Sequence, residues 1–168
     1  FVAHCFLNQN SISDGTAVYP AAFKDLVGFF LNADIGIVQM PCPELCCLGL
    51  NRGNNDGADV PVVIENTRIR KEMQKAESYK MLMVQVDYVM KQIIEYNAYG
   101  FEIIGIIGAN RSPNCGVETT SDFNKEISGK GIFMSELSNR IKAENLNIPM
   151  LGIKDTDNVL DQVKSFIK

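Results

Sequence analysis

The chain has 168 residues, 46% hydrophobic and 21% charged, which is the composition of one compact globular domain. Sixteen Lys and Arg against 20 Asp and Glu give a formal net charge of -4, so no broad basic surface is expected to bind nucleic acid. The longest apolar runs, near residues 26–30 and 103–107, are far shorter than the roughly 20 residues of a membrane span. We therefore expect neither nucleic acid nor a membrane as a partner.

Five cysteines, an odd number, occur in a chain long enough to build its own hydrophobic core. This argues against a secreted scaffold held by disulfides. We expect reduced thiols and a reducing compartment, the cytoplasm.

Short apolar segments alternate with longer amphipathic ones, and this order predicts a β-α-β-α-β-α-β-α chain with a mainly parallel sheet. We expect strands at residues 1–6, 35–40, 101–109 and 148–153. Their nearly continuous apolar runs are typical of strands covered on both faces. The expected fold is α/β, a single-domain Rossmann-like three-layer sandwich with about four strands.

Helices are expected at residues 21–31, 66–96, 131–144 and 157–167. In the second helix, apolar residues recur at steps of four and three, which predicts a buried stripe. The members of this stripe are Leu82, Val86, Val89 and Ile93. In the third helix we expect Ile132, Leu137 and Ile141 to point inward, and an Asp-Thr-Asp sequence at 155–157 suits the start of the fourth.

Residues 49–59 read GLNRGNNDGAD, and their glycines, asparagines and aspartates predict a mobile surface loop. Loops of this length are often functional. We expect the loop to border a site, with Arg52 available to an anionic or carbonyl-bearing substrate. The alternative is a solvated connection without a role.

Three cysteines follow three of the expected strands: Cys5 after the first, Cys42 after the second and Cys115 after the third. The carboxyl ends of parallel strands meet at one edge of the sheet, where ligand sites form. A single cysteine at a strand end is typical of a small buried hydrophobic residue. Three on one edge predict a site.

Soft sulfur ligands select zinc, Cu(I) or iron–sulfur clusters, and three ligands leave a fourth coordination position open. A structural zinc site normally has four protein ligands, often in C-x-x-C pairs, and this chain lacks that pair. Pro43 fixes φ beside Cys42, and Gly116 permits positive φ and a close approach of backbone beside Cys115. The sequence therefore favours a cluster over zinc.

Other polar residues lie near these thiols in the sequence. Either Cys46 or Cys47 is a candidate fourth ligand, sulfur carrier or proton donor, while the other packs inward. Glu44 is a candidate general acid or base, although the sequence is equally compatible with a solvated loop glutamate that has no catalytic role. His4 is the only histidine, and on a strand it points away from Cys5, so we do not expect it to bind metal.

The elements P-C-P-E after the second expected strand and A-N-R-S-P-N-C-G after the third, with a first-strand cysteine followed by Leu7 and Asn8, resemble the 2-thiouracil desulfidase family. The resemblance covers roughly residues 1–118. It implies a 4Fe-4S cluster held by Cys5, Cys42 and Cys115. The fourth iron of that cluster lacks a protein ligand and accepts sulfur from a small thiolated substrate.

Ser112 matches the serine of the family's S-P-x-C-G element and Asp14 its Asp-Gly, so the resemblance implies a catalytic role for Ser112 and substrate binding by Asp14 and Asn8. The chain departs from the family's pattern at Cys46-Cys47 and near Arg52, so the expected catalytic roles of Glu44 and Cys46 and the substrate contact of Arg52 rest on their positions in this sequence. The implied reaction is non-redox: the open iron binds the thiocarbonyl sulfur, water attacks the carbon, and an acid such as Glu44 or a loop thiol protonates the leaving portion.

Two other functions remain open. The first is a non-enzymatic module, stabilised by zinc or a cluster, that binds a partner or a small ligand. The second is a thiol redox protein that uses Cys46 and Cys47, which is less favoured because vicinal cysteines form strained disulfides.

Overall fold

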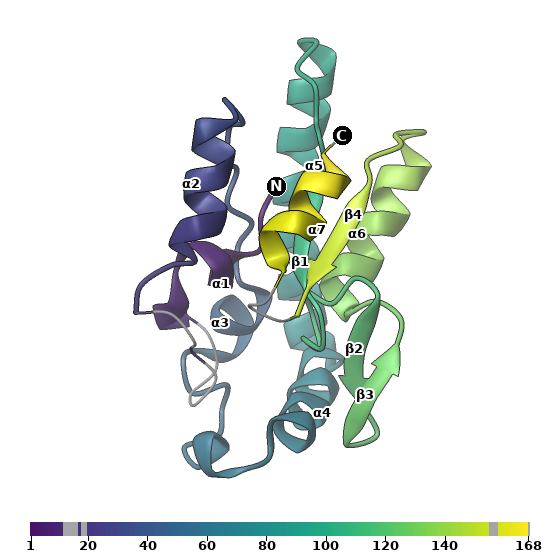
Figure 1. Ribbon diagram of the computed structural model, residues 1–168. Coiled ribbons are helices and arrows are strands. Elements are labelled where there is room, and N and C mark those ends of the chain that lie inside the picture. Colours follow the sequence, from purple (N-terminus) through teal and green to yellow (C-terminus); the bar gives the residue numbers. More distant parts are fainter. Residues whose placement is uncertain (12–16, 18–19, 155–157, 168) are drawn as a thin grey trace.

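The computed structural model describes the chain apart from residues 12–16, 18–19, 155–157 and 168. Its central sheet pairs β1 (Ile106–Ala109) with β4 (Met150–Ile153) in parallel, and Ile106 lies opposite Met150. Val2 forms single parallel bridges to Ile107 on one side and to Gln39 on the other. The segment around Val2 therefore lies beside β1 and the segment around Gln39 lies beside Val2, both parallel to β1 (Figure 1).

These observations confirm the α/β class and the parallel direction, but not a sheet of four regular strands. Of the four expected strands, 148–153 contains β4 and 101–109 contains β1, while 1–6 and 35–40 pair only at single bridges. The first segment leaves the sheet because its chain turns after Ala3 into α1 (His4–Leu7). The N–H of Phe6 donates to the carbonyl of Ala3 at 3.1 Å, which closes that turn.

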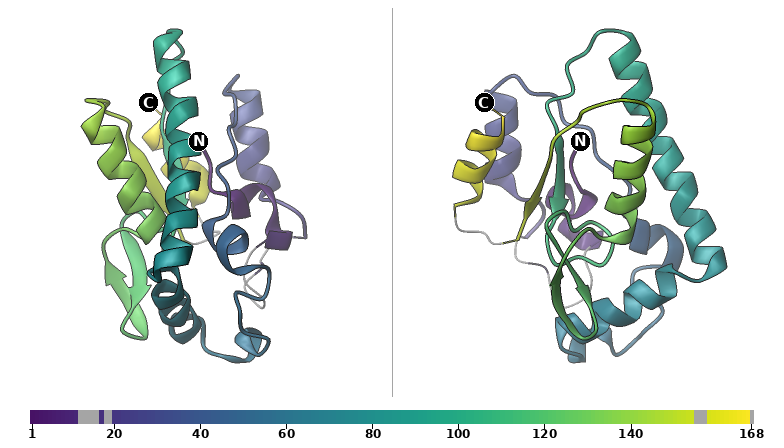
Figure 2. Two further views of the ribbon diagram at one scale, coloured as in Figure 1. Left: turned by 180° about the vertical axis from the view of Figure 1, so that it is seen from behind. Right: turned by 90° about the vertical axis from the view of Figure 1, so that its right-hand side faces the viewer.

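Helices cover both faces of the sheet. Helices α2 (Lys24–Asn32) and α7 (Val159–Phe166) lie on one side, and α5 (Ala76–Ala98) and α6 (Ile132–Ala143) lie on the other (Figure 2). The expected start of the last helix at 155–157 lies outside the described residues. No helix in the described ranges is both long enough and apolar enough to span a membrane.

The expected helix at 66–96 is two helices, because α4 (Val62–Met73) ends before α5 begins at Ala76. The predicted core stripes are confirmed. Six of the seven members are at most 3% exposed, namely Leu82, Val86, Val89 and Ile93 of α5 and Leu137 and Ile141 of α6, and the seventh, Ile132 of α6, is 7% exposed. The two helices bury these stripes against the sheet.

An antiparallel hairpin that the sequence analysis did not expect follows the loop after β1. Its strands are β2 (Thr119–Asp122) and β3 (Lys125–Ser128). Phe123 and Asn124 form the turn with φ of 52° and 58°. The N–H of Asn124 donates to Oγ1 of Thr67 on α4 at 2.9 Å, which anchors the hairpin to that helix.

Candidate active site

Three cysteines lie at the carboxyl edge of the sheet on three separate segments. Cys5 is in α1, Cys42 immediately precedes α3 (Pro43–Leu48), and Cys115 is in the loop after β1. They are close enough to interact electrostatically, because Cys5 and Cys42 both raise the pKa of Cys115. The topology thus brings together residues that are more than 100 positions apart in the sequence.

All three side chains are poorly solvated, and burial is the main cause of their altered acidity. Burial raises the pKa of Cys5 to about 12 and that of Cys42 to about 11, and it raises the pKa of Cys115 well above its usual value. The charge of Glu44 adds to the rise at each of them. The metal-free protein therefore holds three neutral thiols, which must lose protons to bind a metal.

Hydrogen-bond donors point at the three sulfur atoms. The N–H groups of Cys5 and Phe6 lower the pKa of Cys5 and so oppose the effect of burial. Sγ of Cys42 accepts from the N–H of Leu45 at 3.5 Å and from Nη2 of Arg52 at 3.8 Å. Such donors favour the thiolate over the thiol and tune sulfur ligands of clusters.

The position of Cys42 follows from the start of α3. Pro43 occupies the first helical turn, where its missing N–H costs nothing, and Cys42 caps the helix with its own sulfur. The P-C-P-E element therefore fixes the sulfur of Cys42 and the carboxylate of Glu44 relative to each other.

Ser112 holds the turn that carries Cys115. Its Oγ accepts from the N–H of Asn114 at 3.3 Å and from the N–H of Cys115 at 3.0 Å. A hydrogen bond from Ser112 also lowers the pKa of the Cys115 thiol, against the larger effect of burial. The residue expected to be catalytic thus positions one of the three thiols.

Glycines are required around this turn for space. A Cβ on Gly116 would collide with the carbonyl of Thr119, and a Cβ on Gly131 would collide with the backbone of Asn114. Gly116 does not adopt positive φ. Of the two properties that glycine permits, the close approach of backbone is the one required at this position.

His4 differs from its expected placement because it lies in α1 and not on a strand. Its Nδ1 lies 2.6 Å from Nε2 of Gln39. Burial lowers the pKa of His4, and the nearby charge of Arg52 lowers it further. A neutral imidazole therefore lies close to the site.

A buried polar network joins the segment of Cys42 to the loop that carries Cys115. Oε2 of Glu44 accepts from Nε of Arg52 at 3.3 Å, and Oε1 accepts from Nδ2 of Asn114 at 3.0 Å. The three residues are 8%, 2% and 0% exposed, respectively. Because both carboxylate oxygens accept hydrogen bonds, the carboxylate of Glu44 is held in one orientation.

Arg52 is not on the surface as expected. Its Nη1 donates to the carbonyls of Gly49 and Leu50 at 2.9 Å, so the loop wraps around its guanidinium. The Asn- and Gly-rich composition suggested a solvated loop, and the burial arises because Glu44 and Cys42 lie beneath it.

The loop at 49–59, which includes η2 (Gly57–Asp59), is tied to α4. Nη2 of Arg68 donates to the carbonyl of Arg52 at 2.7 Å, and Nδ2 of Asn54 donates to Oε2 of Glu65 at 3.0 Å. Glu65 and Arg68 also form an ion pair with each other. These contacts fix the part of the loop that carries Arg52.

Asn114 was missed by the sequence analysis, although it is the variable residue of the S-P-x-C-G element. It is fully buried, and its Oδ1 has no hydrogen-bond partner among the described residues. An unpaired buried acceptor costs about 1 to 3 kcal/mol. Its position immediately before Cys115 was a usable signal in the sequence.

Cys46 and Cys47 have different environments. Cys46 is exposed, and its charge interacts with Cys42 and Arg52. Cys47 packs inward, where its Sγ donates to the carbonyl of Ser78 at 3.5 Å and accepts from Nε2 of Gln85 at 3.4 Å. Cys46 is therefore the member of the pair that lies beside the site.

The two remaining expected substrate residues lie in the segment after α1. Oδ1 of Asn8 accepts from the N–H of Asn10 at 3.1 Å, which stabilises the turn before η1 (Gln9–Ser11). Asp14 lies outside the described residues.

The three thiols can be compared with the ligand geometry that a zinc ion and an iron–sulfur cluster require. Among the described residues, no three His, Cys, Asp or Glu side chains form a group that could hold a metal ion. A zinc ion requires its sulfur ligands at about 2.3 Å from one point. A cluster takes each thiolate at a different iron, so its ligands stand further apart. Three soft sulfurs, with N–H donors at Cys5 and Cys42 and the side chain of Ser112 at Cys115, have the chemistry of cluster ligands.

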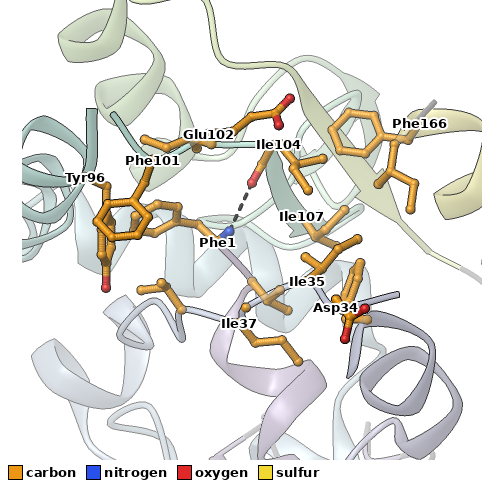
Figure 3. A pocket seen from close by; sticks show the side chains of 17 residues that line it. Phe1, Asp34, Ile35, Ile37, Tyr96, Phe101, Glu102, Ile104, Ile107 and Phe166 are labelled. Carbon is orange, nitrogen blue, oxygen red and sulfur yellow. Dashed lines mark hydrogen bonds between the residues drawn. The ribbon is translucent and has the colours of Figure 1, made fainter. Parts of the chain in front are cut away.

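A cavity of about 470 Å³ lies at the opposite, amino edge of the sheet. Phe1, Ile35, Tyr96 and Phe166 are among the side chains around it (Figure 3). Its wall is mainly apolar and contains none of the five cysteines. The cavity and the thiols are therefore separate features of the molecule.

The chain resembles one protein over nearly its full length. It is 28% identical over 167 residues to "Uncharacterized protein MJ0003" of Methanocaldococcus jannaschii. The aligned region covers 99% of this chain and 90% of the relative. No family model and no solved structure matches the chain.

Proposed function

We propose that the protein is an iron–sulfur desulfidase that removes sulfur from a small thiocarbonyl compound. One observation carries this proposal: three half-buried cysteines from separate segments lie close enough to the buried carboxylate of Glu44 for its charge to raise the pKa of each thiol. A core built only for stability has no use for this arrangement, because burying a charged carboxylate among thiols is costly. Cys5, Cys42 and Cys115 would hold a 4Fe-4S cluster.

The reaction is a hydrolysis. A thiocarbonyl and water give a carbonyl and hydrogen sulfide, so no electrons are lost or gained. When bound, the cluster would supply a Lewis-acidic iron for the thiocarbonyl sulfur. Glu44 has the geometry of a base that orients and deprotonates water, because Arg52 and Asn114 hold its two oxygens. The exposed Cys46 is the candidate proton donor at the entrance.

The proposal extends to fold and location. We count the segments around Val2 and Gln39 as the third and fourth strands of one parallel sheet in a Rossmann-like sandwich, since the N–H of Val2 donates to Val38 and the N–H of Ala3 to Ile107, each at 2.9 Å. All five thiols are free, which suits a reducing compartment such as the cytoplasm.

The test is anaerobic purification followed by visible absorption spectroscopy and analysis of iron and sulfide. We expect a brown protein with about four irons and four sulfides per chain that releases hydrogen sulfide from a thiolactam. A colourless protein with one zinc per chain would contradict the proposal and favour the non-enzymatic module.

A further inference from the structure

The outer face of α5 carries apolar side chains that the described part of the chain leaves exposed. Met81, Val84 and Tyr88 are 41%, 64% and 59% exposed. They recur at steps of three and four, so they form one stripe along the helix, on the side away from the buried stripe. Seen from behind, α5 lies in front of the sheet with no other element over it (Figure 2, left). A contiguous apolar stripe of this kind is typical of an interaction surface.

The same stripe continues into charged residues at both ends. Glu77 lies four residues before Met81, and Lys91 lies three residues after Tyr88, so the spacing of four and three continues unbroken. Both charged side chains are exposed, and neither forms an ion pair with another described residue. The stripe therefore has an acidic end, an apolar middle and a basic end.

This order of residues is complementary to itself when a second copy of α5 runs antiparallel. Glu77 lies seven residues before Val84 and Lys91 lies seven residues after it. A two-fold axis beside Val84 therefore places each Glu77 opposite Lys91 of the other copy. A parallel pair would instead place Glu77 against Glu77 and Lys91 against Lys91. The charges thus favour the antiparallel arrangement.

The apolar and flanking residues match in the same register. Met81 lies three residues before Val84 and Tyr88 four residues after it, so the two differ by about 1.5 Å in height and meet across the axis. Thioether–aromatic contacts of this kind are favourable. On the other flank, Lys80 and Asp87 are related in the same way, and both are exposed. Asp87 also pairs with Arg140 of its own chain at 2.7 Å.

We propose that α5 is the interface through which two copies of this chain form a symmetric dimer, with the two helices antiparallel and Val84 at the axis. The inference does not rest on the proposed function. Tyr and Met are enriched at such interfaces, and charges of opposite sign at the rim fix the register. A contact made by one pair of helices is small, so we expect a dissociation constant on the order of 10 µM.

The first experiment is sedimentation equilibrium of the metal-free protein. A reductant is present because the exposed Cys46 could otherwise cross-link two chains. Between about 1 and 100 µM, the apparent mass should rise from that of one chain, 18.6 kDa, towards twice that value. A mass that stays at 18.6 kDa over the whole range overturns the inference.

The second experiment tests which surface forms the dimer. Val84→Lys places two ammonium groups together at the axis, so dimerisation should weaken on the order of 100-fold. Leu31→Lys is the matched control, because Leu31 is 61% exposed on α2 and Val84 is 64% exposed on α5. It should dimerise as the wild type does. Circular dichroism checks that both variants are folded. Unchanged dimerisation of Val84→Lys, or an equal loss in Leu31→Lys, overturns the inference.

The third experiment tests the antiparallel register. Lys91→Glu places a carboxylate opposite Glu77 of the second copy, so dimerisation should weaken on the order of tenfold. Adding Glu77→Lys to this variant restores opposite charges across the axis, and dimerisation should recover to within about threefold of the wild type. A double variant that dimerises no better than Lys91→Glu alone overturns the arrangement on which the inference depends.

Discussion

The two edges of the sheet differ in what they bury. At the amino edge, Phe1, Ile35, Tyr96 and Phe166 surround a cavity of about 470 Å³ with a mainly apolar wall. At the carboxyl edge, an ion pair, an amide and three thiols are packed together. The cavity and the polar cluster therefore do not coincide, and none of the five cysteines lines the cavity.

The energetics of the two edges explain the contrast. Apolar side chains at the amino edge stabilise the fold by leaving water, at about 25 cal/mol for each Å². At the carboxyl edge, Glu44 and Arg52 lose their hydration, and the ion pair between them compensates for only part of that cost. A buried ion pair is weak evidence for stability. Its presence beside three thiols is better explained by function.

The largest expected effect concerns the thiols. Cys5→Ala, Cys42→Ala and Cys115→Ala should each abolish or severely reduce cluster incorporation, because the two remaining thiolates cannot hold a cluster in place. Iron and sulfide content and the visible spectrum of anaerobic protein measure this. Cys47→Ala is the control, since Cys47 faces Ser78 and Gln85. A full cluster in any of the three variants would refute the site.

The next effect concerns Glu44, at the centre of the carboxyl edge. Glu44→Gln keeps the size of the side chain and removes its capacity as a base, so desulfidation should fall by a factor on the order of 10² to 10⁴ while the cluster still loads. Glu65→Gln is the matched control, because Glu65 is also a buried, ion-paired carboxylate but lies on α4. Full activity of Glu44→Gln would remove Glu44 from the mechanism and make Cys46 the next candidate.

The amino edge should affect stability alone. Phe30 is 4% exposed and lines the cavity there. Phe30→Ala should lower the free energy of unfolding by about 3 to 5 kcal/mol, measured by urea denaturation of the metal-free protein. Cluster content of the folded fraction should equal that of the wild type. A loss of cluster at matched stability would show that the two edges are coupled.

Much of the fold could be predicted from the sequence because local periodicity encodes it. The stripe from Leu82 to Ile93 is a repeat within one helix, and its burial needs no knowledge of distant residues. The hairpin could not be predicted in this way. Its turn is Phe123-Asn124, and an aromatic residue at positive φ is not the Asn-Gly signal of tight hairpins.

The features of the candidate site also differ in whether local sequence patterns predict them. The shared edge of Cys5, Cys42 and Cys115 follows from strand direction, which alternating elements predict. The burial of Arg52 depends on Glu44, which lies in another element, and no local pattern reports such a pair. The unsatisfied acceptor of Asn114 is visible only when its neighbours have been counted in three dimensions.

The smallest expected effect concerns Glu65, which holds the loop that carries Arg52. Hydrogen bonding from Arg68 holds the pKa of Glu65 below its usual value, and Asn54 contributes in the same direction. The carboxylate is thus favoured in the folded state. Its contribution to stability is present above about pH 4.5 and is lost as the pH falls through the lowered pKa.

Glu65→Gln should therefore reduce the free energy of unfolding by about 1 kcal/mol at pH 7, since Arg68 is partly exposed and solvent weakens the pair. The difference from the wild type should shrink in urea titrations below pH 4.5. Glu77→Gln, on the exposed face of α5, is the control and should change stability by less than about 0.5 kcal/mol at either pH. The direct contact from Arg68 to the carbonyl of Arg52 survives the substitution, so cluster loading should not change. If cluster loading instead fell in Glu65→Gln, the proposed functional site would have to include α4.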